Sequence, residues 1–220
     1  MNFEKYKQLT DEIKPYNAKL IAVSKTKPTE DILQVYNKGQ RIFGENKVQE
    51  IVLKQEALPK DIDWHLIGHL QTNKVKHIAP FISLIHSIDS FKLLEEINKQ
   101  AQKNNRVIDC LLQIFIADEE TKFGLSEAEL FQLLDSKEFL LLQNIRICGL
   151  MGMATNTDDK RKIENEFSGL KKLFDKVKGN CFSDNSCFKE ISMGMSSDYK
   201  IALRCGSTMI RVGSIIFGER

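Results

Sequence analysis

The chain has 220 residues, of which 42% are hydrophobic, and its 32 basic and 30 acidic side chains give a formal net charge of +2 at pH 7. This length and apolar content predict a single domain over residues 1–220 with a sizeable core. The balanced charge argues against nucleic acid or a membrane surface as partner, and no apolar run approaches the roughly 20 residues of a membrane span.

Two further features concern the cellular compartment. The N-terminal segment MNFEKYKQLTDEIK lacks the apolar centre of a signal peptide. The odd number of cysteines and the absence of a C-x-x-C pair argue against a disulfide framework and a zinc site. The five cysteines are Cys110, Cys148, Cys181, Cys187 and Cys205. We therefore expect a cytoplasmic protein.

Short β-rich runs alternate with helical segments along the whole chain, which is typical of a parallel α/β sheet. Eight such units predict a (β/α)8 barrel, and a doubly wound sheet remains the alternative. The predicted strands cover residues 19–26, 41–45, 63–68, 84–88, 109–116, 145–151, 188–193 and 208–216.

The two ends of the chain are expected to meet in this barrel. Phe3, Tyr6, Leu9 and Ile13 form one apolar face of a helix ahead of the first strand. The chain stops at Arg220, soon after the eighth strand, so we expect no helix after that strand. The N-terminal helix would then cover the gap between the last and first strands, and deleting it should destabilise the barrel.

The first strand, LIAVS, leads into Lys25. By strand parity Ile21, Val23 and Lys25 share one face, whereas Lys27 falls in the turn that follows. A lysine at the C-terminal end of a buried parallel strand is well placed to form a Schiff base, because burial near other cations favours the neutral amine. The alternative is an ordinary solvated lysine at a strand end.

The segment MGMSSDYKIAL follows the seventh strand and begins a short helix near Ser196 and Ser197. Free backbone N–H groups and serine hydroxyls at such a helix start favour an anion. Ordinary capping of the helix by Ser197 is the alternative.

The eighth strand carries Arg211 among apolar residues, followed by Gly213 and Ser214. A buried guanidinium needs an acceptor, and Gly213 allows close approach of backbone to a ligand. Barrels often bind phosphate at the loops after strands seven and eight, which indicates a phosphate site here. Alternatively, Arg211 pairs with a structural carboxylate such as Glu190 or Glu45.

Other polar or sulfur-containing residues end the remaining strands, and no cluster has metal-ligand spacing. His65, inside its strand, is predicted to be a hydrogen-bonded core histidine, and the sequence suggests no partner for His86. The strand-end residues are Glu45, Asn46, His69, Lys122, Met151 and Met153.

Seven motifs occur in one order along nearly the whole chain: SKTKP, FGENKVQE, WHLIGHLQTNK, TKFG, GLMGMA, SMGMSSDYKIAL and RVGSIIFGER. Together they closely resemble the pyridoxal phosphate homeostasis proteins. This resemblance implies a barrel similar to the N-terminal domain of alanine racemase, which binds pyridoxal 5'-phosphate (PLP) through a lysine Schiff base.

The resemblance also implies residue roles. Lys25 would be the Schiff-base lysine, Arg211 would face the pyridine nitrogen, and Lys122 would lie near the ring. The phosphate cradle would consist of Ser196, Ser197, Gly213 and Ser214, and the pocket wall would include Asn46 and Met151. His69 departs from the smaller or apolar residue expected at its position.

The expected function is intracellular PLP homeostasis without evident catalysis. An arginine keeps the ring nitrogen neutral and the electron sink weak, and related racemases take a second base from a C-terminal domain that this chain lacks. A PLP enzyme of low activity, such as a racemase, and a lysine-dependent aldolase or phosphosugar enzyme remain alternatives. We expect a monomer that passes PLP to apo-enzymes and has no nucleic-acid or membrane partner.

Overall fold

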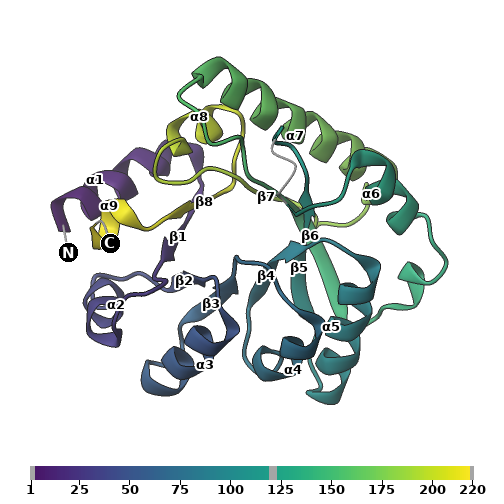
Figure 1. Ribbon diagram of the computed structural model, residues 1–220, viewed down its shortest axis with the longest axis horizontal. Coiled ribbons are helices and arrows are strands. Elements are labelled where there is room, and N and C mark those ends of the chain that lie inside the picture. The colour runs from purple at the N-terminus through teal and green to yellow at the C-terminus, as the bar shows by residue number, and fades with distance from the viewer. Residues whose placement is uncertain (1–2, 119–122, 219–220) are drawn as a thin grey trace.

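Eight parallel strands form a closed barrel in the computed structural model, which describes residues 3–118 and 123–218. Each strand pairs with its neighbours in sequence, and β8 pairs with β1 to close the ring (Figure 1). The predicted barrel is therefore confirmed, and the doubly wound alternative is wrong. The strands are β1 (Lys19–Val23), β2 (Ile42–Glu45), β3 (Asp63–Leu66), β4 (Leu84–Ile88), β5 (Ile108–Ile114), β6 (Ile145–Gly152), β7 (Glu190–Ser192) and β8 (Met209–Val212).

Helices cover the outside of the strands, as Figure 1 shows. They are α1 (Phe3–Ile13), α2 (Thr29–Tyr36), α3 (Val48–Ala57), α4 (Val75–Ile78), α5 (Phe91–Lys103), α6 (Glu127–Leu134), α7 (Lys160–Cys181), α8 (Tyr199–Arg204) and α9 (Ser214–Phe217). Short 3-10 turns are η1 (Lys14–Tyr16), η2 (Thr72–Lys74) and η3 (Phe139–Leu141). Among the described residues, no helix is long and apolar enough to cross a bilayer.

Strand alternation divides the apolar side chains into two clusters. The larger cluster packs the outward faces of the strands against the helices. A smaller cluster, which includes Ile21, Leu111, Met151 and Met209, fills the inside of the barrel. Because successive side chains of a strand point to opposite faces, residues two and four positions beyond Ile21 also point inward, at the C-terminal end of the barrel.

The N-terminal helix lies beside the end of the chain, as the apolar stripe predicted. Helix α1 contacts β1 and α9, and its side chains Tyr6, Leu9 and Ile13 are buried. The hydroxyl of Tyr199, at the start of α8, donates to Glu12 at 2.7 Å. Helix α1 thus packs against β1 and against α8 and α9, the helices that follow β7 and β8.

The end of the chain corrects one expectation. The eighth strand stops at Val212 instead of residue 216, and a single helical turn, α9, follows it. Gly213 leaves the extended conformation, and its carbonyl oxygen accepts the N–H of Phe217 at 2.9 Å. The turn buries Ile216 and Phe217, and this tertiary packing overrides the β propensity of the sequence.

A bulge interrupts the pairing of β5 and β6. Cys110 pairs with Ile147, but Leu111 pairs with Gly149, so that Cys148 is the extra residue. Gly149 has φ +154°, and a Cβ atom there would overlap the carbonyl oxygen of Glu190 in β7. Only glycine fits this close approach of two strands.

Candidate functional site

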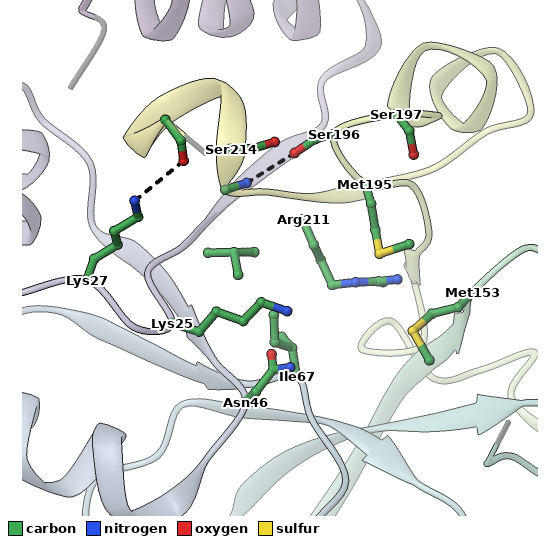
Figure 2. A pocket seen from close by; sticks show the side chains of 13 residues that line it. Lys25, Lys27, Asn46, Ile67, Met153, Met195, Ser196, Ser197, Arg211 and Ser214 are labelled. Atoms are coloured by element: carbon green, nitrogen blue, oxygen red, sulfur yellow. Dashed lines mark hydrogen bonds between the residues drawn. The ribbon is translucent and has the colours of Figure 1, made fainter. Parts of the chain in front are cut away.

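A cavity of about 450 Å³ opens at the C-terminal end of the barrel. Its walls come from the ends of strands or from the loops just beyond them, the part of a barrel where function is usually located. Figure 2 shows the side chains that line it. They belong to Val23, Lys25, Lys27, Asn46, Ile67, Met153, Met195, Ser196, Ser197, Arg211, Gly213, Ser214 and Gly218.

Lys25 extends into this cavity from the loop after β1. Its side chain runs toward the side occupied by Arg211 and Asn46 (Figure 2). Val23, the last residue of β1, also lines the cavity, and Ile21 belongs to the interior cluster below it. The inward face predicted for Lys25 from strand parity is therefore confirmed.

The backbone around Lys25 is held by helix α3. Thr26 has φ +64°, a left-handed conformation that is costly for a β-branched residue. Its N–H donates to a carboxylate oxygen of Glu50 at 2.8 Å. On the other side of Lys25, the ammonium of Lys54 donates to the carbonyl oxygen of Ser24 at 2.8 Å. These two contacts fix the turn that aims Lys25 inward.

Glu45, at the end of β2, completes this anchor. One of its carboxylate oxygens accepts from the Ser24 hydroxyl at 2.6 Å and from Lys54 at 2.7 Å. Its other oxygen is buried without a hydrogen-bond partner in the described part of the chain. Burial raises the pKa of Glu45, although the hydrogen bonds from Lys54 and Ser24 oppose this shift.

Lys27, the other lysine of the cavity, connects two chain segments at its edge. Its ammonium donates to the carbonyl oxygens of Phe217 at 3.2 Å and Gly218 at 3.4 Å. The second of these bonds, to Gly218, is drawn in Figure 2. Lys27 therefore joins the β1 loop to α9.

Arg211 is buried at the side of the cavity and has only neutral acceptors. One terminal nitrogen donates to the carbonyl oxygen of Ser192 at 2.8 Å and to its hydroxyl at 2.6 Å, and the other donates to the carbonyl oxygen of Gly152 at 3.1 Å. The carboxylates of Glu190 and Glu45 pair with lysines instead. Desolvation lowers the pKa of Arg211 to about 10, so it stays charged at neutral pH.

The loops after β7 and β8 supply hydroxyl groups to the cavity. Ser196 and Ser197 lie in a turn before α8, which starts only at Tyr199, so the predicted helix start at these serines is wrong. The hydroxyl of Ser196 accepts the N–H of Gly213 at 3.4 Å, which links the two loops (Figure 2). Ser214 follows in the second loop.

Seven of the eight residues predicted from the sequence line the cavity, and Met151 does not. Met151 is fully buried in the interior cluster one layer below, and Met153 reaches the cavity instead. Lys122 lies outside the described residues. His69 lies beyond the cavity lining, where it pairs with Asp89 at 3.2 Å and stacks on Phe123.

Sequence reasoning missed several wall residues. Ile67 and Met195 line the cavity from the loops after β3 and β7. Ile67 shares the inward parity of His65 along β3, so this signal was present in the sequence. Met195 lies in an irregular loop, where parity gives no orientation.

Comparison with known proteins assigns the sequence and its fold to one family. The family described as "Alanine racemase, N-terminal domain" matches residues 2–220. The pyridoxal phosphate homeostasis protein of Aquifex aeolicus is 41% identical over 204 residues, which cover 92% of this chain and 87% of that protein. The chain belongs to the pyridoxal phosphate homeostasis protein family.

Solved structures agree with this assignment. PipY of Synechococcus elongatus, solved with PLP bound, superposes with a TM-score of 0.88 at 34% identity and covers 98% of this chain and 99% of its own. Alanine racemase from Bartonella henselae, with covalently bound PLP, has a TM-score of 0.71 at 18% identity, covering 98% of this chain and 57% of its own. This second likeness shows a shared barrel fold.

Proposed function

We propose that this protein binds PLP in the cavity at the C-terminal end of its barrel and serves PLP homeostasis in the cytoplasm. One observation carries the proposal: a single cavity gathers an amine, a buried guanidinium and several hydroxyl groups. These groups match the aldehyde, the ring nitrogen and the phosphate of PLP. The names of its relatives and the PLP bound to PipY support the same reading.

The donor set of the cavity fits the cofactor. Bound PLP supplies an aldehyde that condenses with an amine, releasing water, and a pyridine ring that draws electrons from the linked carbon. Lys25 supplies the amine, because it extends into the cavity from an anchored turn. Asn46 forms part of the wall, and Met151 supports the wall from the layer beneath.

The phosphate would lie between the loops after β7 and β8. Ser196, Ser197 and Ser214 offer hydroxyl donors there, and backbone N–H groups add to them. At Gly213 a Cβ atom would lie only 2.9 Å from the carbonyl oxygen of Val23. Glycine therefore keeps this loop close to β1 and hence to the amine.

The protein is proposed to hold PLP without using it catalytically. Arg211 can only donate, so a ring nitrogen beside it stays unprotonated and draws electrons weakly. Racemisation also needs a base on each face of the substrate. Among the described lining residues the cavity has no histidine, tyrosine, cysteine or carboxylate, and Lys27 donates to backbone carbonyls.

A reversible linkage suits a carrier. A second amine, such as the active-site lysine of an apo-enzyme, displaces Lys25 and takes the cofactor away. In this proposal residues 1–220 act as one PLP-binding domain and as a monomer, and neither nucleic acid nor a membrane takes part.

The test is an absorbance spectrum of the purified protein with added PLP, before and after borohydride reduction, followed by mass mapping of the modified lysine. We expect a visible band that reduction removes, and one modified residue, Lys25. A protein that stays colourless would favour an aldolase or phosphosugar enzyme. Turnover of an amino acid at about 1 s⁻¹ or more would favour a PLP enzyme.

A further inference from the structure

A chain of four buried side chains crosses the inside of the barrel beneath the cavity. Arg211 on β8 donates to the hydroxyl of Ser192 on β7 at 2.6 Å. The same hydroxyl lies 2.9 Å from Nδ1 of His86 on β4, and Nε2 of His86 lies 3.0 Å from Nδ1 of His65 on β3. None of the four residues is more than 5% exposed.

Arg211 sets the direction of every bond in this chain. A guanidinium has no acceptor, so the Ser192 oxygen must accept from it. Among the residues that the structure describes, the Ser192 hydroxyl proton then has one acceptor within reach, Nδ1 of His86. A neutral His86 therefore carries its proton on Nε2 and donates it to Nδ1 of His65, whose own proton is left on Nε2.

Electrostatics favours the same arrangement. Both histidines are buried, and burial, followed by the neighbouring His65 and the charge of Arg211, keeps the pKa of His86 well below its usual range. Each donor in the chain points away from the guanidinium, so the bonds polarise one another in one sense. Two charged residues outside this hydrogen-bonded series also act on it. Asp198 acts on Arg211, and Lys19 acts on His65.

These hydrogen bonds leave Arg211 charged and fixed in position, with some of its N–H donors not yet used. Three of its five N–H donors are bound, two to Ser192 and one to Gly152. The Nε–H and one terminal N–H have no acceptor within the described residues. A cofactor ring at the cavity side of Arg211 would find these donors already oriented.

We propose that Ser192 and His86, supported by His65, are positioning residues that orient Arg211 toward the ring nitrogen of bound PLP. This inference rests on the proposed function of the cavity. It assigns a task to two histidines that do not line the cavity. It also explains why the interior layer is polar here, although an unpaired polar side chain in a core is costly.

Two measurements test the inference separately. The first uses cofactor-free protein and long-range ¹H–¹⁵N NMR of the histidine rings. We expect protons on Nε2 of both His65 and His86, and a changed His86 signal in Ser192→Ala. A proton on Nδ1 of His86 in the wild-type protein would overturn the proposed direction of the chain.

The second measurement compares PLP binding by Ser192→Ala, His86→Leu and His86→Asn. The first two variants should bind PLP roughly tenfold more weakly, the scale of one hydrogen bond to a charged group. They should also shift the ¹⁵N resonance of PLP labelled at its ring nitrogen. Asparagine offers an acceptor near the position of Nδ1, so His86→Asn should recover part of both effects. His77→Asn, exposed on α4, is the matched control.

The outcomes are distinct. Unchanged affinity and an unchanged ring ¹⁵N resonance in folded Ser192→Ala and His86→Leu would overturn the positioning role. Failure of the wild-type protein to bind PLP would overturn the proposed function, and this role with it, whereas the NMR result on cofactor-free protein reports the hydrogen-bonded chain independently.

Discussion

Acidification should destabilise the cofactor-free protein through its buried histidines. Burial lowers the pKa of His65 to about 3, against 6.5 in the unfolded chain. Between these two values the unfolded state binds a proton that the folded state does not. The contribution of His65 is therefore complete above pH 6.5 and is lost progressively as the pH falls toward 3.

The size of the effect follows from this window. A pH of 5 lies 1.5 units below the pKa of 6.5 that His65 has in the unfolded chain, so the unfolded histidine is protonated while the folded one remains neutral. At 1.36 kcal/mol per unit, His65 alone should lower the free energy of unfolding by about 2 kcal/mol relative to pH 7.5. His86, whose pKa is also lowered by burial, adds to the loss.

Urea unfolding of wild-type and His65→Asn protein at pH 7.5, 6.5 and 5 measures this effect. The variant cannot bind the proton, so its stability should fall by about 2 kcal/mol less between pH 7.5 and 5. The contribution of Glu45 is shared by both proteins and cancels in the comparison, and burial, the main cause of the low pKa of His86, is also shared. His77→Asn controls for removal of an exposed histidine. Parallel pH profiles for the wild type and His65→Asn would refute the reasoning.

Three further predictions concern the cofactor, the N-terminal helix and the bulge. Lys25→Ala should abolish the visible absorbance with added PLP and Lys27→Ala should retain it; a band that survives the first change would move the linkage to another lysine. Leu9→Ala in α1 should lower the free energy of urea unfolding by about 2–5 kcal/mol, and a loss well under 1 kcal/mol would mean that α1 contributes little. Gly149→Ala should prevent native folding, because its Cβ would overlap the Glu190 carbonyl oxygen; a native melting temperature by circular dichroism would contradict this.

Strand parity predicts much of the site because the barrel repeats one geometric rule. Lys25 lies two positions beyond Val23 on the inward face of β1, and Arg211 lies two positions beyond Met209 on that of β8. Pairing of β1 with β8 then brings the two residues to one side of the cavity. Local alternation and closure of the sheet together determine this arrangement.

Strand parity tells which side chains point inward, but it does not tell which of them reach the cavity and which lie deeper inside the barrel. Met151 and Met153 point the same way, but β6 continues to Gly152, so Met151 belongs to the interior layer and Met153 reaches the cavity. Alternation also fails to show where a strand ends, and the strand predicted over 208–216 stops at Val212. Its final residues gain more by packing as a helical turn than by extending β8.

The buried histidine chain shows a different limit of sequence reasoning. His65 was predicted to be a hydrogen-bonded core residue, and its bond to His86 confirms this. The partners lie 21 residues apart, and Ser192 lies 106 residues beyond His86. His65 and His86 meet because β3 pairs with β4, whereas the contact from His86 on β4 to Ser192 on β7 crosses the barrel and forms only when the sheet closes. No local pattern therefore identifies Ser192 as a partner.

The neutral partners of Arg211 bear most directly on what the cavity can do. A carboxylate paired with this guanidinium would neutralise its charge, whereas the carbonyl and hydroxyl oxygens that hold it leave that charge in place. A charge that persists beside a pyridine nitrogen opposes protonation of that nitrogen. In the proposed complex, Arg211 would therefore hold the ring and at the same time limit its power to activate a substrate, which is the balance expected of a protein that holds PLP for others.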